Sequence, residues 1–216
     1  MEKKIIIFTG PSLHPSDAKK ILNAEYHPPV GRGDILNALN DSPKFIGIID
    51  GVFHQRPAVS HKELLKALDQ EVTLVGGASM GALRASELNE FGMMGIGKVY
   101  EAYKSGEIES DDDVAVVFNP QTMEQLSEAL ISMRYNFQKA CEEGLISPEE
   151  LKTLNRTAKS IYYPKRTYKK VLNNSNIDPL KLSLLEDFLE KNGKDIKRED
   201  AILVLKCIKN LIKLHK

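Results

Sequence analysis

The sequence is poor in several features that would each indicate a class of protein. It has no tryptophan and two cysteines, and its 30 basic residues balance its 30 acidic ones. A net charge of zero excludes a general electrostatic attraction to nucleic acid or to an anionic membrane. No apolar run approaches the length of a membrane span, and no signal-peptide pattern is present. We therefore expect a cytoplasmic protein that binds neither nucleic acid nor membrane.

The cysteines and glycines also lack the spacing of common cofactor sites. Cys141 and Cys207 lie far apart and form no Cys-x-x-Cys pair, so both are interpreted as small buried hydrophobes. The turn after the first expected strand lacks Gly-x-Gly-x-x-Gly, which disfavours dinucleotide binding. We expect no metal site and no cofactor.

Short apolar runs alternate with amphipathic segments through the first half of the chain. This alternation is typical of a parallel sheet whose strands are joined by crossover helices. After Pro120 the pattern changes to amphipathic helices alone. The sequence predicts an α/β fold, Rossmann-like or hydrolase-like, with a core over residues 1–120 and a helical C-terminal part over 121–216. The apolar runs are 4–9, 45–49, 72–75 and 114–118, and the later helices 123–143, 147–161, 179–191 and 199–214.

Polar groups follow each of the first three expected strands. Because the carboxyl ends of neighbouring parallel strands meet at one edge of a sheet, we expect these groups to face one crevice. They are Gly10, Pro11 and Ser12 after the first strand, Asp50 and His54 after the second, and Ser79 after the third.

Ser79 has the most specific surroundings of these groups. It lies in Gly77-Ala78-Ser79-Met80-Gly81, the Gly-x-Ser-x-Gly pattern of a nucleophile elbow between a strand and a helix. Such a serine is exposed on a strained turn, and the glycines avoid clashes with neighbouring backbone. The backbone N–H of Met80 could stabilise an oxyanion. The alternative is a serine that only caps the following helix, and the pattern alone does not decide between the two.

A serine nucleophile needs a base, and two histidines are candidates. His54 and His61 lie between the second and third strands, although each could equally be a solvated side chain. An α/β hydrolase places its acid and histidine after the serine, and this chain offers only His215 there. Here the acid Asp50 comes first in the chain, then His54 or His61, then Ser79. Convergent triads permit this acid–histidine–serine order.

Three other charged segments allow two interpretations each. Arg84 could bind a carboxylate, or could pair with Glu87 or Glu90 on the helix surface. The acidic run 111–113 could bind a cation, but it is more typical of a solvated turn. The basic and aromatic stretch 156–170 could dock an acidic protein or peptide, or could form a solvated helix face with half-buried tyrosines.

Taken together, several segments resemble the TfuA-like proteins, a family named for a factor in trifolitoxin biosynthesis. The resemblance covers nearly the whole chain, and it is most specific where the segment 77–85 combines with Asp50-Gly51. The matching segments are 8–13, 28–34, 48–53, 61–63, 77–85, 91–97 and 112–115, with weaker likeness over 163–168 and 197–201.

The resemblance implies a role in backbone thioamidation. TfuA-like proteins act beside YcaO enzymes, which use ATP to activate a peptide amide for replacement of its oxygen by sulfur. The family is understood to release sulfur from a thiocarboxylated, ubiquitin-like carrier of the ThiS type. The modified substrate is methyl-coenzyme M reductase in methanogens, at a glycine that becomes thioglycine, and a ribosomally made peptide elsewhere. The composition, rich in Lys and Ile, favours the first.

Hydrolysis of a thiocarboxylate is acyl-transfer chemistry, which suits a serine, a base and an oxyanion hole. The resemblance therefore implies Ser79 as nucleophile or hydrogen-bond donor, His54 or His61 as base, and Asp50 as the partner that orients the base. Arg84 or the Met80 N–H would stabilise the anion. The residues expected to bind substrate are Gly10, Pro11, Ser12, Arg32, Asp34, Gly77 and Met80.

Two other functions stay open at this point. The protein could be a non-catalytic partner that recruits or activates YcaO, in which case the stretch 156–170 matters more than Ser79. It could also be an unrelated serine esterase or peptidase.

Overall fold

The computed structural model describes residues 4–52 and 56–214. The chain divides into two compact units, one of Met1–Asp111 with Lys197–Lys216 and one of Asp112–Ile196. The sequence predicts a boundary near residue 120, between an α/β core and a helical C-terminal part. The structure differs because the last helix returns to the first unit. Within the described ranges, no helix is both long and apolar enough to cross a lipid bilayer.

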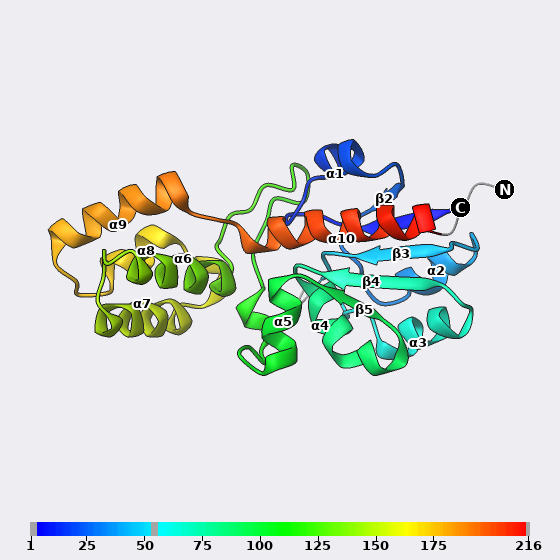
Figure 1. Ribbon diagram of the computed structural model, residues 1–216, viewed down its shortest axis with the longest axis horizontal. Helices are drawn as coiled ribbons and strands as arrows, with labels where there is room; N and C mark the ends of the chain where they lie inside the picture. Colours follow the sequence, from blue (N-terminus) through cyan, green and yellow to red (C-terminus); the bar gives the residue numbers. More distant parts are fainter. Residues whose placement is uncertain (1–3, 53–55, 215–216) are drawn as a thin grey trace. The chain divides into compact units, whose positions relative to one another are not determined.

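The first unit contains a five-stranded sheet, ordered β2-β1-β3-β4-β5, in which every pair of strands is parallel (Figure 1). This confirms the predicted α/β fold. The two edge strands are short and were not predicted. The apolar run 114–118 does not join this sheet, and its Phe118 forms an isolated antiparallel bridge with Gln125. The strands are β1 (Ile5–Phe8), β2 (Glu25–His27), β3 (Phe45–Ile48), β4 (Thr73–Gly77) and β5 (Met94–Ile96).

One face of the sheet packs against three helices, α2 (Asp34–Leu39), α3 (His61–Asp69) and α4 (Met80–Leu88). Alternate strand residues point to this face, as the period of two in a strand requires. The start of α3 is fixed by a capping box, in which Ser60 and Glu63 satisfy each other's backbone N–H groups. The buried residues of this face include Ile6, Phe8, Ile46, Ile48, Leu64, Leu74 and Ala85.

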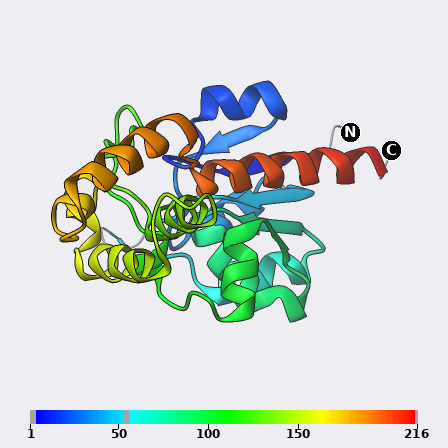
Figure 2. The same ribbon diagram turned by 60° about the vertical axis from the view of Figure 1, so that its left-hand side comes forward.

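The opposite face is covered by α1 (Pro15–Ile21) and α10 (Ile196–Leu214), as both Figure 1 and Figure 2 show. Two strand glycines let α10 approach the sheet closely. A Cβ atom on Gly47 would lie 2.8 Å from Cδ1 of Ile208, and one on Gly77 would lie 2.6 Å from Cγ2 of Val204. These two α10 residues are one helical turn apart, so they occupy neighbouring gaps in the sheet surface.

Helix α10 also fixes the start of α5 (Lys98–Ser105). The buried carboxylate of Asp200 accepts hydrogen bonds from the N–H groups of Lys98, at 2.9 Å, and Val99, at 2.8 Å. Gly97 leaves room for this carboxylate, since a Cβ there would overlap it. Burial raises the pKa of Asp200 to about 6, although the two N–H donors act to lower it.

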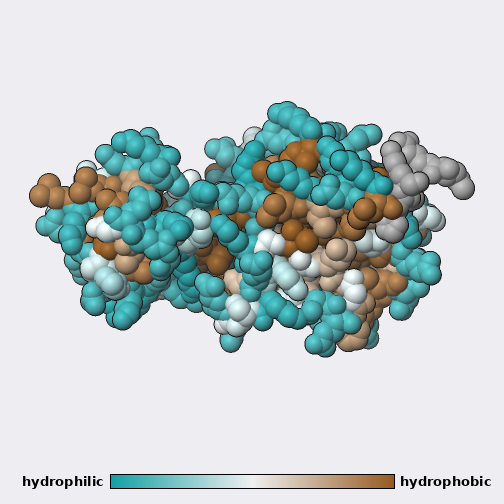
Figure 3. All heavy atoms as spheres, in the orientation of Figure 1, coloured by the Kyte–Doolittle hydropathy of each residue, from teal (hydrophilic) through white to brown (hydrophobic). Residues whose placement is uncertain are grey.

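The second unit is a helical bundle with its own apolar core. Ser147 caps one of its helices, and Pro148 follows at the first helical position, where a missing N–H costs nothing. Leu180 and Leu184 of α9 remain 78% and 56% exposed, and apolar surface is visible over this helix in Figure 3. Its helices are α6 (Leu130–Glu142), α7 (Pro148–Ser160), α8 (Tyr168–Asn173) and α9 (Pro179–Asn192), and the short 3-10 turns of the chain are η1 (Asn89–Phe91), η2 (Asp111–Asp113) and η3 (Tyr163–Lys165).

A fully buried arginine binds the residues at the start of the second unit. Arg166 donates to both carboxylate oxygens of Asp112 at 3.0 Å, as well as to three backbone carbonyls. Lys159 also pairs with Asp112, and the buried Asp113 pairs with Arg134 at 2.8 Å. The acidic run is therefore not the solvated turn that its composition suggested, because basic residues distant in sequence neutralise it.

Candidate functional site

The strand order places a topological switch point between β1 and β3. In this order, successive connections leave the two strands in opposite directions, and ligands in such sheets bind beyond the carboxyl ends of the strands at that point. β4 pairs with β3 on the other side. The ends of the three strands that carry the candidate residues are thus neighbours, as the sequence analysis expected.

Asp50, two residues after the end of β3, binds the loop that follows β1. Its Oδ2 accepts hydrogen bonds from the N–H groups of Gly10, at 2.8 Å, and Ser12, at 3.0 Å. Its Oδ1 accepts the Ser12 hydroxyl at 2.6 Å. Asp50 is 2% exposed. These bonds bring Asp50 together with the Gly10–Ser12 segment, and the carboxylate serves this loop rather than a histidine of the described chain.

Ser79 lies on a tight turn between β4 and α4. The Ser79 N–H donates to the Gly77 carbonyl at 2.8 Å, which closes a three-residue γ-turn around Ala78. Ala78 has φ +67°, a left-handed conformation that is strained for a residue with a Cβ. The strain expected of a nucleophile elbow is therefore present, but it resides at Ala78. Ser79 itself has φ −135° and ψ −118°.

The glycines around Ser79 allow close backbone packing. A Cβ on Gly81 would lie 1.8 Å from the Ile48 carbonyl oxygen, and one on Gly76 would lie 2.2 Å from the Gly81 carbonyl oxygen. The side chain of Met80 similarly occupies the space beside Gly51, where a Cβ on that glycine would lie. The first turn of α4 is thus pressed against the ends of β3 and β4, and larger residues would displace it.

The hydroxyl of Ser79 has no partner among the described residues. The exposure predicted for Ser79 is wrong, since the residue is 1% exposed. Ser79 occupies the N-cap position of α4, yet its side chain makes no capping hydrogen bond. This disfavours the interpretation of Ser79 as a simple helix cap, in which the hydroxyl would accept from the first helical turn. An orphaned buried hydroxyl costs free energy and indicates a place where a ligand can supply the missing bond.

Three N–H groups in the first turns of α4 have backbone acceptors among the described residues. Gly81 donates to the Ile49 carbonyl at 3.3 Å, and Ala82 and Leu83 donate to the Ser79 carbonyl at 2.9 and 3.2 Å. The Met80 N–H, at the first helical position, has no intrahelical acceptor. Together with the helix dipole, this N–H and the Ser79 hydroxyl form a small site suited to a negatively charged oxygen or sulfur.

His61 and Arg84 are brought together, but around Glu87. His61 Nε2 lies 2.8 Å from Glu87 Oε2, and Arg84 Nη1 donates to the same oxygen at 2.6 Å. Arg84 Nε also donates to the Val59 carbonyl at 3.1 Å. Glu87 follows Ser79 by eight residues, which is about 12 Å along a helix axis. The structure therefore places His61 toward the far end of α4 from Ser79. The other candidate base, His54, lies outside the described residues.

Arg32 lies on the loop between β2 and α2, and Asp34 is the first residue of α2. The Asp34 carboxylate accepts from the Gly31 N–H and from Arg56 Nη2, both at 2.7 Å, so it braces the loop. Glu63 Oε2 accepts the Gly33 N–H at 2.7 Å and ties the loop to α3. The side chain of Arg32 is exposed, so of the two residues it is the one available to a substrate.

Much of the basic and aromatic stretch 156–170 is used within the second unit. Lys159 and Arg166 pair with Asp112, and the Tyr168 hydroxyl accepts from Asn136 at 2.7 Å. Tyr162 is 64% exposed and packs edge to face against Tyr163. No group of three or more metal-binding side chains occurs in the part of the chain that the structure describes.

Comparison with known proteins gives one family. The family model described as TfuA-like protein matches residues 50–167, which is more than half of the chain. The match begins at Asp50 and includes the turn at Ser79. No match to a curated protein was found. On this match the chain belongs to the TfuA-like family.

Proposed function

We propose that this protein hydrolyses the C-terminal thiocarboxylate of a ubiquitin-like, ThiS-type sulfur carrier and delivers the sulfide to a YcaO enzyme for backbone thioamidation. The modified residue would be a glycine of methyl-coenzyme M reductase. The observation that carries the proposal is the buried, unpartnered Ser79 hydroxyl beside the Met80 N–H at the start of α4. Membership of the TfuA-like family supports the partner and the substrate class.

The Ser79 hydroxyl attacks the thiocarboxylate carbon and gives its proton to a base. The resulting tetrahedral anion is stabilised by the Met80 N–H and the dipole of α4. The base then gives this proton to the sulfur as the carbon–sulfur bond breaks, so that hydrosulfide leaves. Water, activated by the same base, hydrolyses the acyl-serine to a carboxylate and frees the Ser79 hydroxyl. No oxidant or reductant is needed.

Access to Ser79 is restricted, because the residue is 1% exposed. A substrate therefore reaches the hydroxyl only through a narrow, extended group, which the C-terminal tail of a carrier protein provides. The exposure of Arg32, on the loop before α2, supports a role for this residue in attracting an acidic carrier surface.

The main test measures sulfide released from thiocarboxylated carrier. Ser79→Ala should reduce the rate by at least about 100-fold, as loss of a nucleophile or an anion donor does. Ser86→Ala is a matched control, because the Ser86 hydroxyl lies on the same helix but donates to the Leu83 carbonyl at 2.7 Å. If a folded Ser79→Ala protein released sulfide at an undiminished rate, the proposal would be contradicted.

A second measurement distinguishes the two roles of Ser79. A nucleophile forms an acyl-enzyme, which mass spectrometry of the quenched reaction detects as carrier attached to Ser79. If Ser79 only donates a hydrogen bond while water attacks directly, activity falls in Ser79→Ala but no adduct forms with the unaltered protein.

The base is tested by comparing two histidines. We propose His54 as the base, because His61 lies within hydrogen-bond distance of the Glu87 carboxylate. This pair is near the end of α4 that is far from Ser79. His54→Asn should lower sulfide release and alter its pH dependence, whereas His61→Asn should leave the pH profile unchanged. The reverse pattern would assign the base to His61.

The alternative function is a non-catalytic partner that recruits or activates YcaO. The exposed Tyr162, in the basic and aromatic stretch 156–170, favours it. It predicts unchanged peptide affinity of YcaO with Ser79→Ala and a loss of that affinity with Tyr162→Ala. A general serine esterase would instead turn over simple esters and react rapidly with a fluorophosphonate at Ser79.

A further inference from the structure

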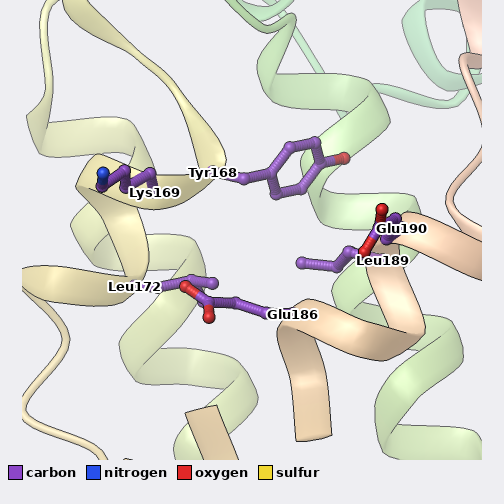
Figure 4. Close-up of a pocket in the computed structure, with 6 residues that line it drawn as sticks. All are labelled: Tyr168, Lys169, Leu172, Glu186, Leu189 and Glu190. Carbon is purple, nitrogen blue, oxygen red and sulfur yellow. The ribbon is translucent and has the colours of Figure 1, made fainter. Parts of the chain in front are cut away.

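The second unit contains a cavity between α8 and α9 that the proposed hydrolysis does not use. Its volume of about 480 Å³ falls in the range of pockets that hold small ligands. Figure 4 shows its walls coming from both helices. The lining residues are Tyr168, Lys169, Leu172, Glu186, Leu189 and Glu190.

The apolar wall of this cavity is held in place by the core of the bundle. The Tyr168 hydroxyl accepts a hydrogen bond from Asn136 Nδ2 at 2.7 Å, and its ring packs edge to face on Phe137 with centroids 5.9 Å apart. Asn136 is itself bonded to both backbone groups of Lys194. Leu172 is 1% exposed. The wall formed by Tyr168 and Leu172 is therefore preformed, whereas the charged lining residues Lys169, Glu186 and Glu190 are exposed.

Two carboxylates line the cavity together with one cation, Lys169. Glu186 and Glu190 are exposed and lie one turn apart on α9, and no ion pair to either occurs among the described residues. Like charges at this spacing oppose each other. Lys169 extends to the opposite side from Tyr168 in Figure 4. On a different face of the same helix, Asp187 does pair with Lys191.

We propose that this cavity binds a peptide segment that presents a bulky aliphatic or aromatic side chain beside a lysine or arginine. The apolar side chain enters between Tyr168, Leu172 and Leu189, while the cation pairs with Glu186 and Glu190. Exposed ion pairs contribute little by themselves, so most of the affinity must come from burial of the apolar side chain. This is why a peptide segment fits better than a free amine.

The binding experiment uses fluorescence anisotropy with the full-length protein. The probe is a labelled peptide of the pattern Gly-Lys-Leu-Leu-Lys-Gly, and the comparison peptides replace both leucines by alanine or both lysines by glutamate. We expect saturable binding of the probe and at least about tenfold weaker binding of each comparison peptide. No saturable binding up to millimolar concentration, or equal binding of the alanine peptide, would overturn the proposal.

Charge reversals on α9 locate the site. Glu186→Lys and Glu190→Lys should each weaken binding of the probe by about tenfold or more. Asp187→Lys makes the same change of charge on the same helix, away from the cavity, and should change binding less than about twofold. Equal losses in all three variants would show a general charge effect and contradict the assignment.

The cavity site does not rest on the proposed hydrolysis. Ser79→Ala should leave binding of the probe unchanged, and Glu186→Lys should leave hydrolysis of the isolated carrier unchanged. The failure of one proposal is thus distinguishable from the failure of the other.

Discussion

Among single residues, Ser79 stands out because nothing in the described chain satisfies its buried hydroxyl. The neighbouring strain at Ala78, with φ +67°, is maintained only because the turn is packed from both sides. Strained residues and orphaned polar groups gather at functional sites, where a ligand completes the arrangement. The two features together make the turn before α4 the strongest candidate for chemistry.

Gly81 is expected to be intolerant of even the smallest side chain. In Gly81→Ala, the new Cβ would lie 1.8 Å from the Ile48 carbonyl oxygen, so the first turn of α4 must move. We expect a loss of about 3 kcal/mol or more in the free energy of unfolding, measured by urea denaturation. Gly106→Ala is the comparison, since only its φ of +76° opposes a side chain there and the cost should be about 1–2 kcal/mol.

Asp50 is expected to act through the conformation of the loop after β1. Asp50→Asn replaces one accepting oxygen by a donor that faces the N–H groups or hydroxyl of residues 10–12. We expect a loss of about 2–3 kcal/mol in stability and faster amide hydrogen exchange of Ser12. Unchanged exchange at Ser12 would contradict this role and return Asp50 to a direct catalytic one.

At the scale of elements, the helices of the first unit differ in how their first N–H groups are capped. α3 is capped by its own capping box, α5 by Asp200 from another helix, and α4 by no side chain. The start of α2 also has no side-chain cap, but the carboxylate of Asp34 in its first turn would repel an anion. Because the first N–H groups of a helix need acceptors, the uncapped start of α4 is therefore better suited to an external anion. This contrast between neighbouring helices supports the placement of the ligand site.

The cap of α5 should make stability depend on pH. The pKa of Asp200 is about 6 in the folded protein, above its ordinary 3.8, so the folded state binds the proton more tightly. The stabilisation from this proton is present below about pH 4 and is lost as pH rises through 6. The loss amounts to about 3 kcal/mol.

Urea unfolding of the unaltered protein and of Asp200→Asn between pH 4 and 7 tests this. The stability of the unaltered protein relative to the variant should fall as pH rises. A difference that stays constant or grows with pH would contradict the raised pKa.

At the scale of the whole molecule, the last helix of the chain packs against the sheet that the first half of the chain forms. α10 supplies the buried residues Ala201, Val204, Leu205 and Ile208 to one face of the sheet. The first half of the chain therefore cannot bury both faces of its sheet without residues from the far end of the sequence. Parallel sheets are stable only when both faces are covered.

Loss of one α10 side chain should destabilise the sheet. Ile208→Ala removes a fully buried group that lies over Gly47, and we expect a cost of about 2–5 kcal/mol. Leu214→Ala, on the same helix but 81% exposed, should change stability by less than about 0.5 kcal/mol. Equal effects of the two variants in thermal unfolding would show that α10 is not part of the core.

The sequence by itself determined the features that depend on local pattern. The alternation of apolar runs and helices predicted the α/β fold, and the polar ends of three strands predicted where candidate residues gather. The Gly-x-Ser-x-Gly pattern predicted the tight turn and its close packing, because glycine is needed where backbones approach within the radius of a methyl group.

Only the tertiary structure decided which long-range partners those residues take. Asp50 bonds to the loop after β1, His61 and Arg84 meet at Glu87, and Arg166 neutralises Asp112. The sequence pattern did not show that α10 rejoins the sheet, since an amphipathic helix indicates that one face is buried but not against what. Hydrogen bonds and ion pairs between residues distant in sequence leave no periodic signal, and so the orphaned hydroxyl of Ser79 became visible only in the folded chain.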